Sequence, residues 1–555
     1  MTTMKTTIKT LLAALVVSST FFSCTSEEDI PAGPVGHLKF VATTSMDNAA
    51  KTNVSGRQYT KLNEGNVVTF TSGDAISIFD GTANNQFSTS DAGTTATFSG
   101  DASTVDSYTA LYPYQASATL EGTTLTATLP TQQKAQEALT YDPTAALSVA
   151  TTTKEDMKLV FKNVTAMLKV TTTEPLKMIV LKGNKGEKLS GNVTINVSDT
   201  PTSVADVDSV ALVPVSGESF PAGTYYINVA TGGGAEFKFE DGFKFDCYAP
   251  DGFIFSRKVN KAVTLKRSVI LNVGQLDWIE CAKANGLLDA NGHDFVYLGL
   301  PAVNGERMLW ATMNIGANSP EEYGDYFAWG ETEPYYSELN AVKDEANGKY
   351  NVNPTWKTTP KNYAQWGYDA GANGTGGVWQ NYKYNGKNPN AGEDFGFTKY
   401  NTSDNKYVLD LEDDVARVKW GGNWKTPSTD ELKQIDGRTM DQMFAGKSDK
   451  VNIEFTKEKG IYGFKITPKS DVYAFNNELF IPTAGYIQST TLKNAGSEGQ
   501  YWTSMLDHTQ QDNAYNMYMC TEFFVIYMDG LEFMITTKRA YGLPVRPVML
   551  VKSSR

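Results

Sequence analysis

Four acidic residues near position 410 form the most concentrated set of oxygen ligands in the sequence: Asp410, Glu412, Asp413 and Asp414. Calcium takes carboxylate oxygens as ligands, but this run lacks the D-x-D-x-D-G spacing of a calcium loop. Val-Ala-Arg-Val follows directly, and acidic residues are stabilised at a helix N-terminus by the helix dipole. The pattern therefore favours the start of a short helix and no metal site, with calcium as the alternative.

The residues that could act as nucleophile and base are few and scattered. His37, His293 and His508 stand alone, with no serine motif or cysteine partner beside them. A Ser-His-Asp mechanism needs these groups in one constellation, and the sequence offers no motif for it. Three of the four cysteines, Cys247, Cys281 and Cys520, are expected to be unpaired core thiols, with one disulfide as the alternative. We therefore expect no enzyme and no cofactor.

Length and charge limit the remaining classes. The 555 residues suit about three domains. With 49 basic and 62 acidic residues the net charge is −13, which argues against nucleic acid as a partner because phosphates call for basic stripes. An apolar content of 41% with 12% aromatic residues excludes wholesale disorder.

Tryptophan divides the chain into two kinds of sequence, because all nine tryptophans lie between Trp278 and Trp502. The stretch 335–400 is rich in aromatic residues, Gly and Asn. Exposed aromatic rings can stack on the C–H faces of sugars or pack against protein partners. The candidates for ligand contact are Trp329, Trp356, Trp366, Trp379 and Tyr382. The alternative is that these rings cover the domain core.

The N-terminus has the features of a secretory signal. Lys5 and Lys9 precede a short apolar stretch from Leu11 to Val17, too short to span a bilayer. Ser23-Cys24 resembles a bacterial lipobox, which implies that Cys24 carries lipid and anchors the chain to the outer membrane. Phe21 stands where the usual lipobox has leucine, and an ordinary signal with a coincidental cysteine is the alternative.

The residues after Cys24 are acidic: Ser26, Glu27, Glu28 and Asp29. They resemble the export tag that directs Bacteroidetes lipoproteins to the outer face of the outer membrane; a solvated linker is the alternative. No later segment approaches 18 continuous apolar residues, so we expect the lipid to be the membrane anchor.

Residues 37–277 read as strands. HLKFVATT at 37–44 alternates apolar and polar residues, as a half-buried strand does. FKFEDGFKF at 237–245 predicts a hairpin with an Asp-Gly turn, and Pro250-Asp251-Gly252 predicts a further turn. Repeated short strands predict two β-sandwiches divided near residue 150.

Five stretches of this region resemble the fimbrillin family of Bacteroidetes pilus subunits: FTSGDAISIF (70–79), ALYPY (110–114), FKNVTAMLKV (161–170), FPAGTYYINV (220–229) and LKRSVILNVGQLD (265–277). Each stretch alone is also ordinary sandwich framework. The resemblance implies two transthyretin-like β-sandwiches and assembly with other fimbrillin subunits by strand exchange. In that family a protease removes an N-terminal strand, and a neighbour's strand fills the exposed groove. Here the strand would be 37–44, and Arg57 is the candidate processing site, although surface loops often contain arginine.

The third part begins with an expected short helix at 278–284, ended by Gly286, and an expected hinge at 289–292. Ser428 and Glu431 predict a capping box at a second helix. Residues 545–548 are expected to pair with an opening strand at 295–300.

Six motifs of this part resemble the paralogous-domain family of Bacteroidetes and Fibrobacter surface lipoproteins, which is similar to the C-type-lectin-like fold: 295–316, 324–334, WGGNWKTPSTDEL (420–432), IPTAGY (481–486), YWTS (501–504) and YGLPVRPV (541–548). That fold also houses formylglycine-generating oxidases, but their paired cysteines are missing, since this domain has Cys520 alone. The calcium motifs of animal lectins are missing too.

The expected protein is mainly β: two transthyretin-like β-sandwiches followed by an α+β C-type-lectin-like domain. The expected divisions are a signal at 1–23, a tether at 24–36, sandwiches at 37–150 and 151–277, a linker at 278–292, and the lectin-like domain at 293–552. The leading function is a surface pilus tip or adhesin subunit that binds a glycan or protein ligand. The alternative is a glycan-binding surface lipoprotein that does not polymerise.

Overall fold

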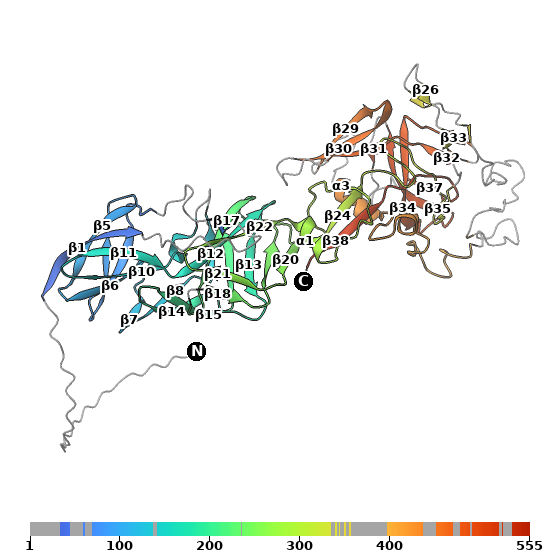
Figure 1. Cartoon of the computed structure of the whole chain (residues 1–555). Coiled ribbons are helices and arrows are strands. Elements are labelled where there is room, and N and C mark those ends of the chain that lie inside the picture. Colours follow the sequence, from blue (N-terminus) through green and yellow to red (C-terminus); the bar gives the residue numbers. More distant parts are fainter. Residues whose placement is uncertain are drawn as a thin grey trace, which may run out of the picture.

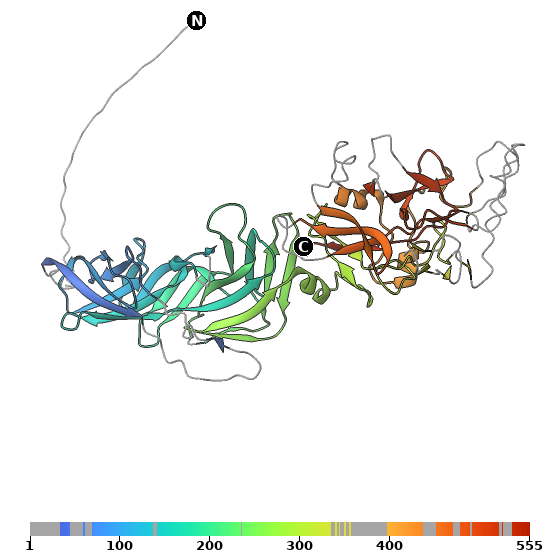
Figure 2. The same cartoon turned by 90° about the horizontal axis from the view of Figure 1, so that it is seen from above.

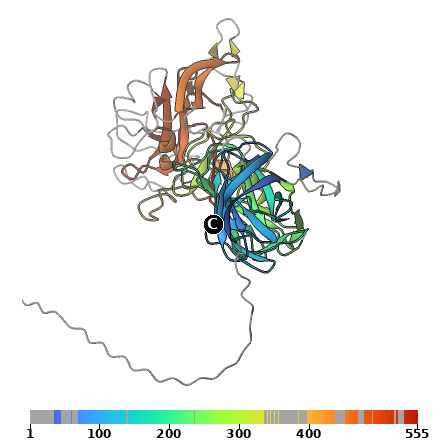
Figure 3. The same ribbon diagram turned by 90° about the vertical axis from the view of Figure 1, so that its left-hand side faces the viewer.

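The computed structural model describes most of the chain: residues 34–44, 59–60, 69–136, 141–234, 236–334, 339–340, 343–344, 349–350, 355–356, 384, 397–436, 451–469, 478–488, 491–520, 524–525 and 535–554. The protein is mainly β, as the alternating sequence predicts. Its parts lie in a row, with the first strands at one end and the C-terminal strands at the other (Figures 1 and 2). Seen from the barrel end, the C-terminal part is offset to one side (Figure 3).

The N-terminal part is a closed seven-stranded barrel. Around the barrel the order is β1 (Val35–Thr44), β11 (Lys158–Asn163), β10 (Ser148–Thr153), β6 (Ser107–Tyr112), β3 (Ala75–Phe79), β4 (Asn84–Ser88) and β5 (Thr95–Ser103). Phe40, Ile76, Ile78, Phe87 and Phe98 are among the residues that fill its core. In β11 buried residues alternate with exposed ones, whereas both faces of β3 are buried, because Phe79 packs with Leu111 and Val149 in a second core cluster.

The second part is a β-sandwich. One sheet runs β17 (Gly223–Ala230), β12 (Thr165–Thr172), β22 (Ile270–Leu276) and β2 (Tyr59–Thr60). The other runs β20 (Ile254–Val259), β19 (Phe243–Tyr248), β13 (Met178–Gly183), β16 (Ser209–Pro214) and β9 (Gln132–Ala135). Leu168 and Ile227 of the first sheet share a core with Ile179, Leu212 and Phe245 of the second. A two-stranded sheet of β18 (Glu236–Phe239) and β21 (Val263–Lys266) adds to this core.

Strands from before and after residue 150 pair with one another in both N-terminal parts. The division expected at residue 150 therefore does not coincide with a break between sheets. β10 and β11 belong to the barrel. Conversely, β8 (Thr124–Leu129) pairs with β14 (Ser190–Asn196), and β9 pairs with β16. The sheet of β8 is completed by β7 (Thr119–Glu121) and β15 (Thr202–Val207). A 3₁₀ turn, η1 (Pro143–Ala145), precedes β10.

The prediction of a hairpin at 237–245 is wrong. β18 pairs with β21, whereas β19 pairs with β13 and β20. The Asp241-Gly242 turn therefore carries the chain from one sheet to another, and Gly242 adopts a φ of 82° to make the turn. The turn expected at Pro250-Asp251-Gly252 is confirmed, because it joins the antiparallel pair β19 and β20.

Beyond β22 the chain enters α1 (Trp278–Ala284), the expected short helix, with Asp277 as its N-cap. The expected hinge at 289–292 is tied down, because Asp289 exchanges two hydrogen bonds with Asn423, of 2.6 and 2.8 Å. A three-stranded sheet then runs β23 (Phe295–Val296), β24 (Glu306–Ala311) and β38 (Val548–Lys552). The C-terminal strand thus joins the expected sheet, but it pairs with β24 and not with 295–300.

Among the described residues, the rest of the C-terminal domain consists of small sheets and two helices. The helices are α2 (Val415–Trp420) and α3 (Thr429–Asp436). The pairs and sheets are β25 (Leu339–Asn340) with β28 (Thr355–Trp356), β26 (Lys343–Asp344) with β27 (Lys349–Tyr350), β29 (Val451–Glu458) with β30 (Ile461–Pro468) and β31 (Leu479–Pro482), β32 (Tyr486–Gln488) with β33 (Thr491–Lys493), and β34 (Glu498–Leu506) with β35 (Asn513–Cys520), β36 (Phe524–Val525) and β37 (Thr536–Lys538).

Two local predictions about these helices are confirmed. Asp414 is the N-cap of α2 and accepts a hydrogen bond from the amide of Ala416. Ser428 and Glu431 form the capping box of α3: the Ser428 amide donates to Glu431 Oε2 at 2.9 Å, and the Glu431 amide donates to Ser428 Oγ at 3.3 Å. In the part of the chain that the structure describes, no helix is long and apolar enough to cross a membrane.

Candidate functional site

The first candidate site is the seat of β1, by which we mean the position of β1 between β5 and β11 in the barrel. β1 pairs antiparallel with β5 from Val35↔Ser103 to Thr43↔Thr95, and parallel with β11 from Val41↔Lys158 to Thr44↔Phe161. The strand expected at 37–44 therefore exists, and its neighbours hold it along both edges. Taking it away would leave unpaired N–H and C=O groups on β5 and on β11.

The inward face of β1 fills the barrel core. Phe40 and Ala42 are fully buried. The Phe40 ring makes edge-on contacts with Phe87, at a centroid distance of 5.4 Å, and with Tyr108, at 5.1 Å. Val41, which points outward, is 41% exposed. Removal of β1 would thus open an apolar groove between two strand edges, and a replacement strand would need an apolar side chain at every second position.

The chain that links β1 to the rest of the protein runs from Thr44 to Tyr59. Arg57, the candidate processing residue, lies outside the described residues, as do Cys24 and the acidic residues Ser26, Glu27, Glu28 and Asp29. Tyr59 and Thr60 form β2, which pairs with Leu271 and Ile270 of β22 in the second sandwich. A single cut between Thr44 and Tyr59 would therefore leave β1 held by non-covalent contacts alone.

The second candidate site is the aromatic surface expected in the C-terminal domain, and the structure corrects one of its members. Trp329 is fully buried and offers no ring face to a ligand. Its Nε1 donates to the carbonyl of Thr503 at 2.9 Å, and its ring packs edge-on against Tyr400 at 5.1 Å. Trp356 lies in β28, of which the backbone alone is described. Trp366, Trp379 and Tyr382 lie outside the described residues.

Trp329 packs in the core beside a buried arginine, Arg539, whose burial could not be recognised from the sequence. Arg539 is fully buried, with its guanidinium 4.2 Å from the Phe397 ring centroid, 5.2 Å from that of Trp329 and 5.8 Å from that of Tyr384. It donates to the carbonyl of Tyr400 at 3.0 Å. The cation–π contacts and carbonyl acceptors replace the water that a surface arginine would keep.

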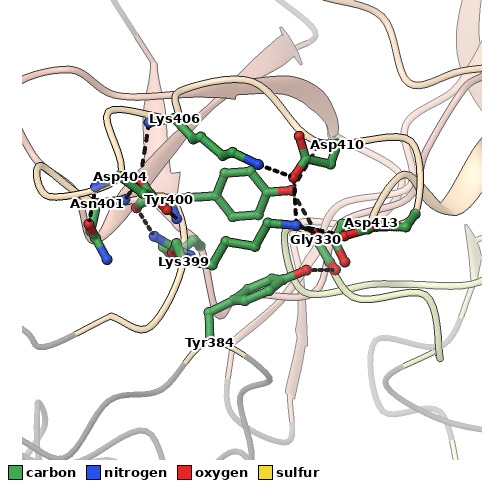
Figure 4. Close-up of polar contacts among 11 residues, drawn as sticks. Gly330, Tyr384, Lys399, Tyr400, Asn401, Asp404, Lys406, Asp410 and Asp413 are labelled. Carbon is green, nitrogen blue, oxygen red and sulfur yellow. Dashed lines mark hydrogen bonds and ion pairs between the residues drawn. The ribbon is translucent and has the colours of Figure 1, made fainter.

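The acidic cluster of the first candidate motif surrounds a lysine (Figure 4). Lys399 Nζ lies 2.6 Å from Asp410 Oδ2, 3.1 Å from Glu412 Oε1 and 2.6 Å from Asp413 Oδ2. Carboxylate oxygens of these three residues lie close enough together to hold a cation, and the ammonium group supplies one. Hydrogen bonds from Lys399 and Lys406 lower the pKa of Asp410. Two lysines of the chain itself therefore offset most of the negative charge of these three carboxylates.

Tyr400 ties this cluster to the core. Its hydroxyl donates to Asp413 Oδ2 at 2.7 Å and accepts from the amide of Asp410 at 2.8 Å. Tyr384, at the end of the long aromatic stretch, donates to the carbonyl of Gly330 at 3.1 Å (Figure 4). Burial and the Asp413 carboxylate raise the pKa of Tyr400. The phenol therefore stays neutral and acts as a hydrogen-bond donor at physiological pH.

Replacing Lys399 with methionine should destabilise the C-terminal domain by about 1–3 kcal/mol at pH 7, because three carboxylates lose their shared cation. The loss should shrink as pH falls through the ordinary aspartate range, because the pKa of Asp410 is lowered by Lys399 in the folded state and that stabilisation disappears on protonation. Urea unfolding of both proteins at several pH values measures this difference.

The matched control for that prediction is Lys406→Met. Lys406 contacts Asp410 alone among the three carboxylates and is 45% exposed, so its loss should cost less than about 1 kcal/mol. Equal losses for the two variants, or a loss at Lys399 that does not change with pH, would contradict the assignment.

Comparison with known proteins adds neighbours but no family. No family model matches the sequence, and no curated protein matches it. Among solved structures, a proposed cell adhesion protein from Bacteroides uniformis is similar at 16% identity and a TM-score of 0.26, over 41% of this chain and 89% of that one. A proposed adhesin from Bacteroides ovatus matches at 9% identity and a TM-score of 0.20, over 44% of this chain and 88% of its own. A fimbrial protein from Bacteroides ovatus matches over 92% of this chain and 99% of that one, at 12% identity and a TM-score of 0.19. With TM-scores this low, these likenesses carry no conclusion about this chain.

Proposed function

We propose that this chain is a fimbrillin-type surface lipoprotein, in which a strand of another subunit takes the place of β1. The observation that supports the proposal is the seat of β1 itself. The strand lies at the end of the molecule away from the C-terminal domain (Figure 1), it pairs with a strand on each side, and Phe40 and Ala42 of its inward face are fully buried. A cut after Arg57, in the segment between Thr44 and Tyr59, would release it.

The other end of the molecule supports a tip or adhesin position. β38 is engaged in its own domain: it pairs with β24, and Val548, Met549 and Val551 are buried. A subunit whose C-terminal strand is engaged in this way accepts a donor strand but does not provide one. In this proposal Cys24 carries the lipid, Ser26 to Asp29 direct export to the outer face, and the C-terminal domain points outward.

The finer assignments belong to the same proposal. The second N-terminal part is a transthyretin-like sandwich, whereas the first, expected as a sandwich, is a closed barrel. The C-terminal domain is C-type-lectin-like and binds a glycan or protein ligand without catalysing a reaction. Trp356, Trp366, Trp379 and Tyr382 are the remaining candidates for ligand contact. Trp329 is withdrawn from that set, because its ring is enclosed by the core.

One observation favours the alternative, a glycan-binding surface lipoprotein that does not polymerise. The barrel is closed and complete with its own β1, so the protein needs no partner strand to bury its core. In that case the surface form would keep residues 24–57 and would bind polysaccharide as a monomer.

Immuno-electron microscopy with antibodies to the C-terminal domain distinguishes these functions. Label at pilus ends is the expected result. Label along whole shafts would contradict the tip role. Label on the cell surface without pili, together with an N-terminus at Cys24, would support the non-polymerising alternative.

A further inference from the structure

The second sandwich and the C-terminal domain meet at a closely packed joint. One continuous hydrophobic core includes Phe245 and Phe253 of the sandwich, Trp278 of α1, and Tyr297 of the C-terminal domain. The chain returns to the joint at its C-terminal end (Figures 1 and 2), where the Ser554 amide donates to the carbonyl of Ile254 at 2.7 Å. The two parts are therefore joined by packing and hydrogen bonds as well as by the chain.

A buried arginine lies at the centre of this joint. Arg307 of β24 is fully buried and bridges two carboxylates of the sandwich: Nη1 lies 2.7 Å from Glu174 Oε2, and Nε lies 3.0 Å from Asp251 Oδ2. Its guanidinium lies 4.5 Å from the Phe253 ring centroid and 5.0 Å from that of Trp278. Both carboxylates belong to the sandwich and the cation belongs to the C-terminal domain, so these ion pairs hold the two parts together.

The carboxylates of Asp251 and Glu174 accept different numbers of hydrogen bonds. Asp251 accepts from Arg307 Nε and Nη2, from the amide of Ala302 at 2.9 Å and from the amide of Phe253 at 3.1 Å. Glu174 accepts from Arg307 Nη1 alone, and its Oε1 has no hydrogen-bond partner among the described residues. Hydrogen bonds to a carboxylate stabilise its charged form. Of the two carboxylates, Glu174 is therefore the one that would take up a proton.

The charge balance of the joint points the same way. Two carboxylates share one guanidinium, so with both ionised the joint buries one uncompensated negative charge. Asp277 before α1, Cys247 of β19 and Tyr297 beside Arg307 are among the other titratable groups that act on the pair, and none of these three is a cation. Arg257 of β20 acts on Cys247, and its guanidinium donates to the carbonyl of Gln275. Burying an unpaired charge is costly, and protonation is the usual relief.

We infer that the joint is a proton-sensitive clamp: Glu174 takes up a proton from solvent in mild acid, and the sandwich and the C-terminal domain are then held together more firmly. This goes beyond the proposed function and does not depend on it. With Glu174 protonated, Arg307 and Asp251 remain as a balanced ion pair, and the neutral carboxyl group still accepts from Arg307 through its carbonyl oxygen.

The pKa directions agree with this geometry. Burial raises the pKa of Glu174, outweighing the Arg307 charge. Burial also acts to raise the pKa of Asp251, but the Arg307 guanidinium and two backbone amides together hold it below its usual value. Because the folded-state pKa of Glu174 lies above the unfolded one, its contribution to stability is fully present below the ordinary glutamate pKa and is lost as pH rises through the raised value.

Glu174→Gln tests the clamp, because glutamine imitates the protonated carboxyl group at every pH. In thermal unfolding of the full chain, we expect the variant to melt about 2–4 °C above the wild type at pH 8 and within 1 °C of it near pH 5. Hydrogen exchange of peptides from α1 and from residues 548–554 should slow several-fold in the variant at pH 8, with both proteins compared at the same pH.

Two further variants serve as controls for this test. Glu218→Gln removes an exposed carboxylate of the same sandwich and should change neither readout. Asp251→Asn should lower the melting temperature at both pH values, because Asp251 is the well-paired carboxylate. A Glu174→Gln variant that melts below the wild type at pH 8, or whose difference from the wild type is the same at both pH values, would overturn the clamp.

Discussion

Phe40→Ala should lower the free energy of unfolding of the barrel by about 3–5 kcal/mol, the range measured for truncating a buried phenylalanine. The Phe40 side chain is fully buried and contacts the rings of Phe87 and Tyr108. Its loss leaves a cavity that the closed barrel cannot easily collapse around. Urea unfolding of the full chain, followed by circular dichroism, measures the change.

Val41→Ala is the matched control, since it truncates the next residue of the same strand. Val41 is 41% exposed, so its truncation should cost less than about 0.5 kcal/mol. If the two variants were destabilised equally, the inward face of β1 would not be the part that fills the groove. The same contrast defines what a donor strand must supply, which is a bulky apolar residue at the position of Phe40.

Trp329→Ala should destabilise the C-terminal domain by about 3–5 kcal/mol. The substitution removes a fully buried indole, its hydrogen bond to Thr503, and one of the rings that enclose the buried Arg539 guanidinium. Thermal unfolding and a ligand-binding assay on the same preparations separate a structural role from a contact role.

Phe455→Ala and Trp329→Phe are the controls for that prediction. Phe455 is 36% exposed in β29 of the same domain, so its truncation should cost only about 1 kcal/mol. Trp329→Phe keeps a six-membered ring but loses the hydrogen bond to Thr503, so it should be destabilised less than Trp329→Ala and bind ligand as the wild type does. A Trp329→Ala protein of normal stability that had lost ligand binding would restore Trp329 as a contact residue.

Local patterns in the sequence predict local structure well here. The alternation at 37–44 matches β1, the 278–284 helix is α1, and the N-cap Asp414 and the capping box of Ser428 and Glu431 are as expected. These features depend on neighbours within a few residues. The periodicity of a strand, the oxygen of a cap and the spacing of a capping box are all visible in a short window.

The partner of each strand was harder to predict from the sequence than the strand itself, for a physical reason. Phe237 and Phe239 alternate just as Phe243 and Phe245 do, and alternation shows which side of a strand is buried but not which strand lies beside it. An Asp-Gly turn suits a hairpin, yet here it carries the chain between two sheets. For the same reason β8 and β9 lie before residue 150 but pair with strands of the second sandwich.

The contacts at the candidate sites were also hard to predict, because they join residues that are far apart in the sequence. Buried arginines break the usual rule that charged residues are exposed, so neither Arg539, which encloses Trp329 in the core, nor Arg307, at the joint, could be recognised from sequence. Lys399 lies outside the acidic run with which it forms ion pairs, and only the fold brings it to Asp410 and Asp413. Sequence patterns supplied the acids, and the counter-charge came from elsewhere in the chain.

The claim that β1 occupies a seat open to another chain's strand has a direct test. A protease site inserted between Thr44 and Tyr59 allows the full chain to be cut there, unfolded in urea and refolded with an excess of a fluorescent peptide of residues 35–44. We predict that the peptide enters the barrel in place of β1, and that the same peptide carrying Phe40→Asp does not. Refolding that excludes the unaltered peptide at every excess, or that accepts both peptides equally, would contradict the account.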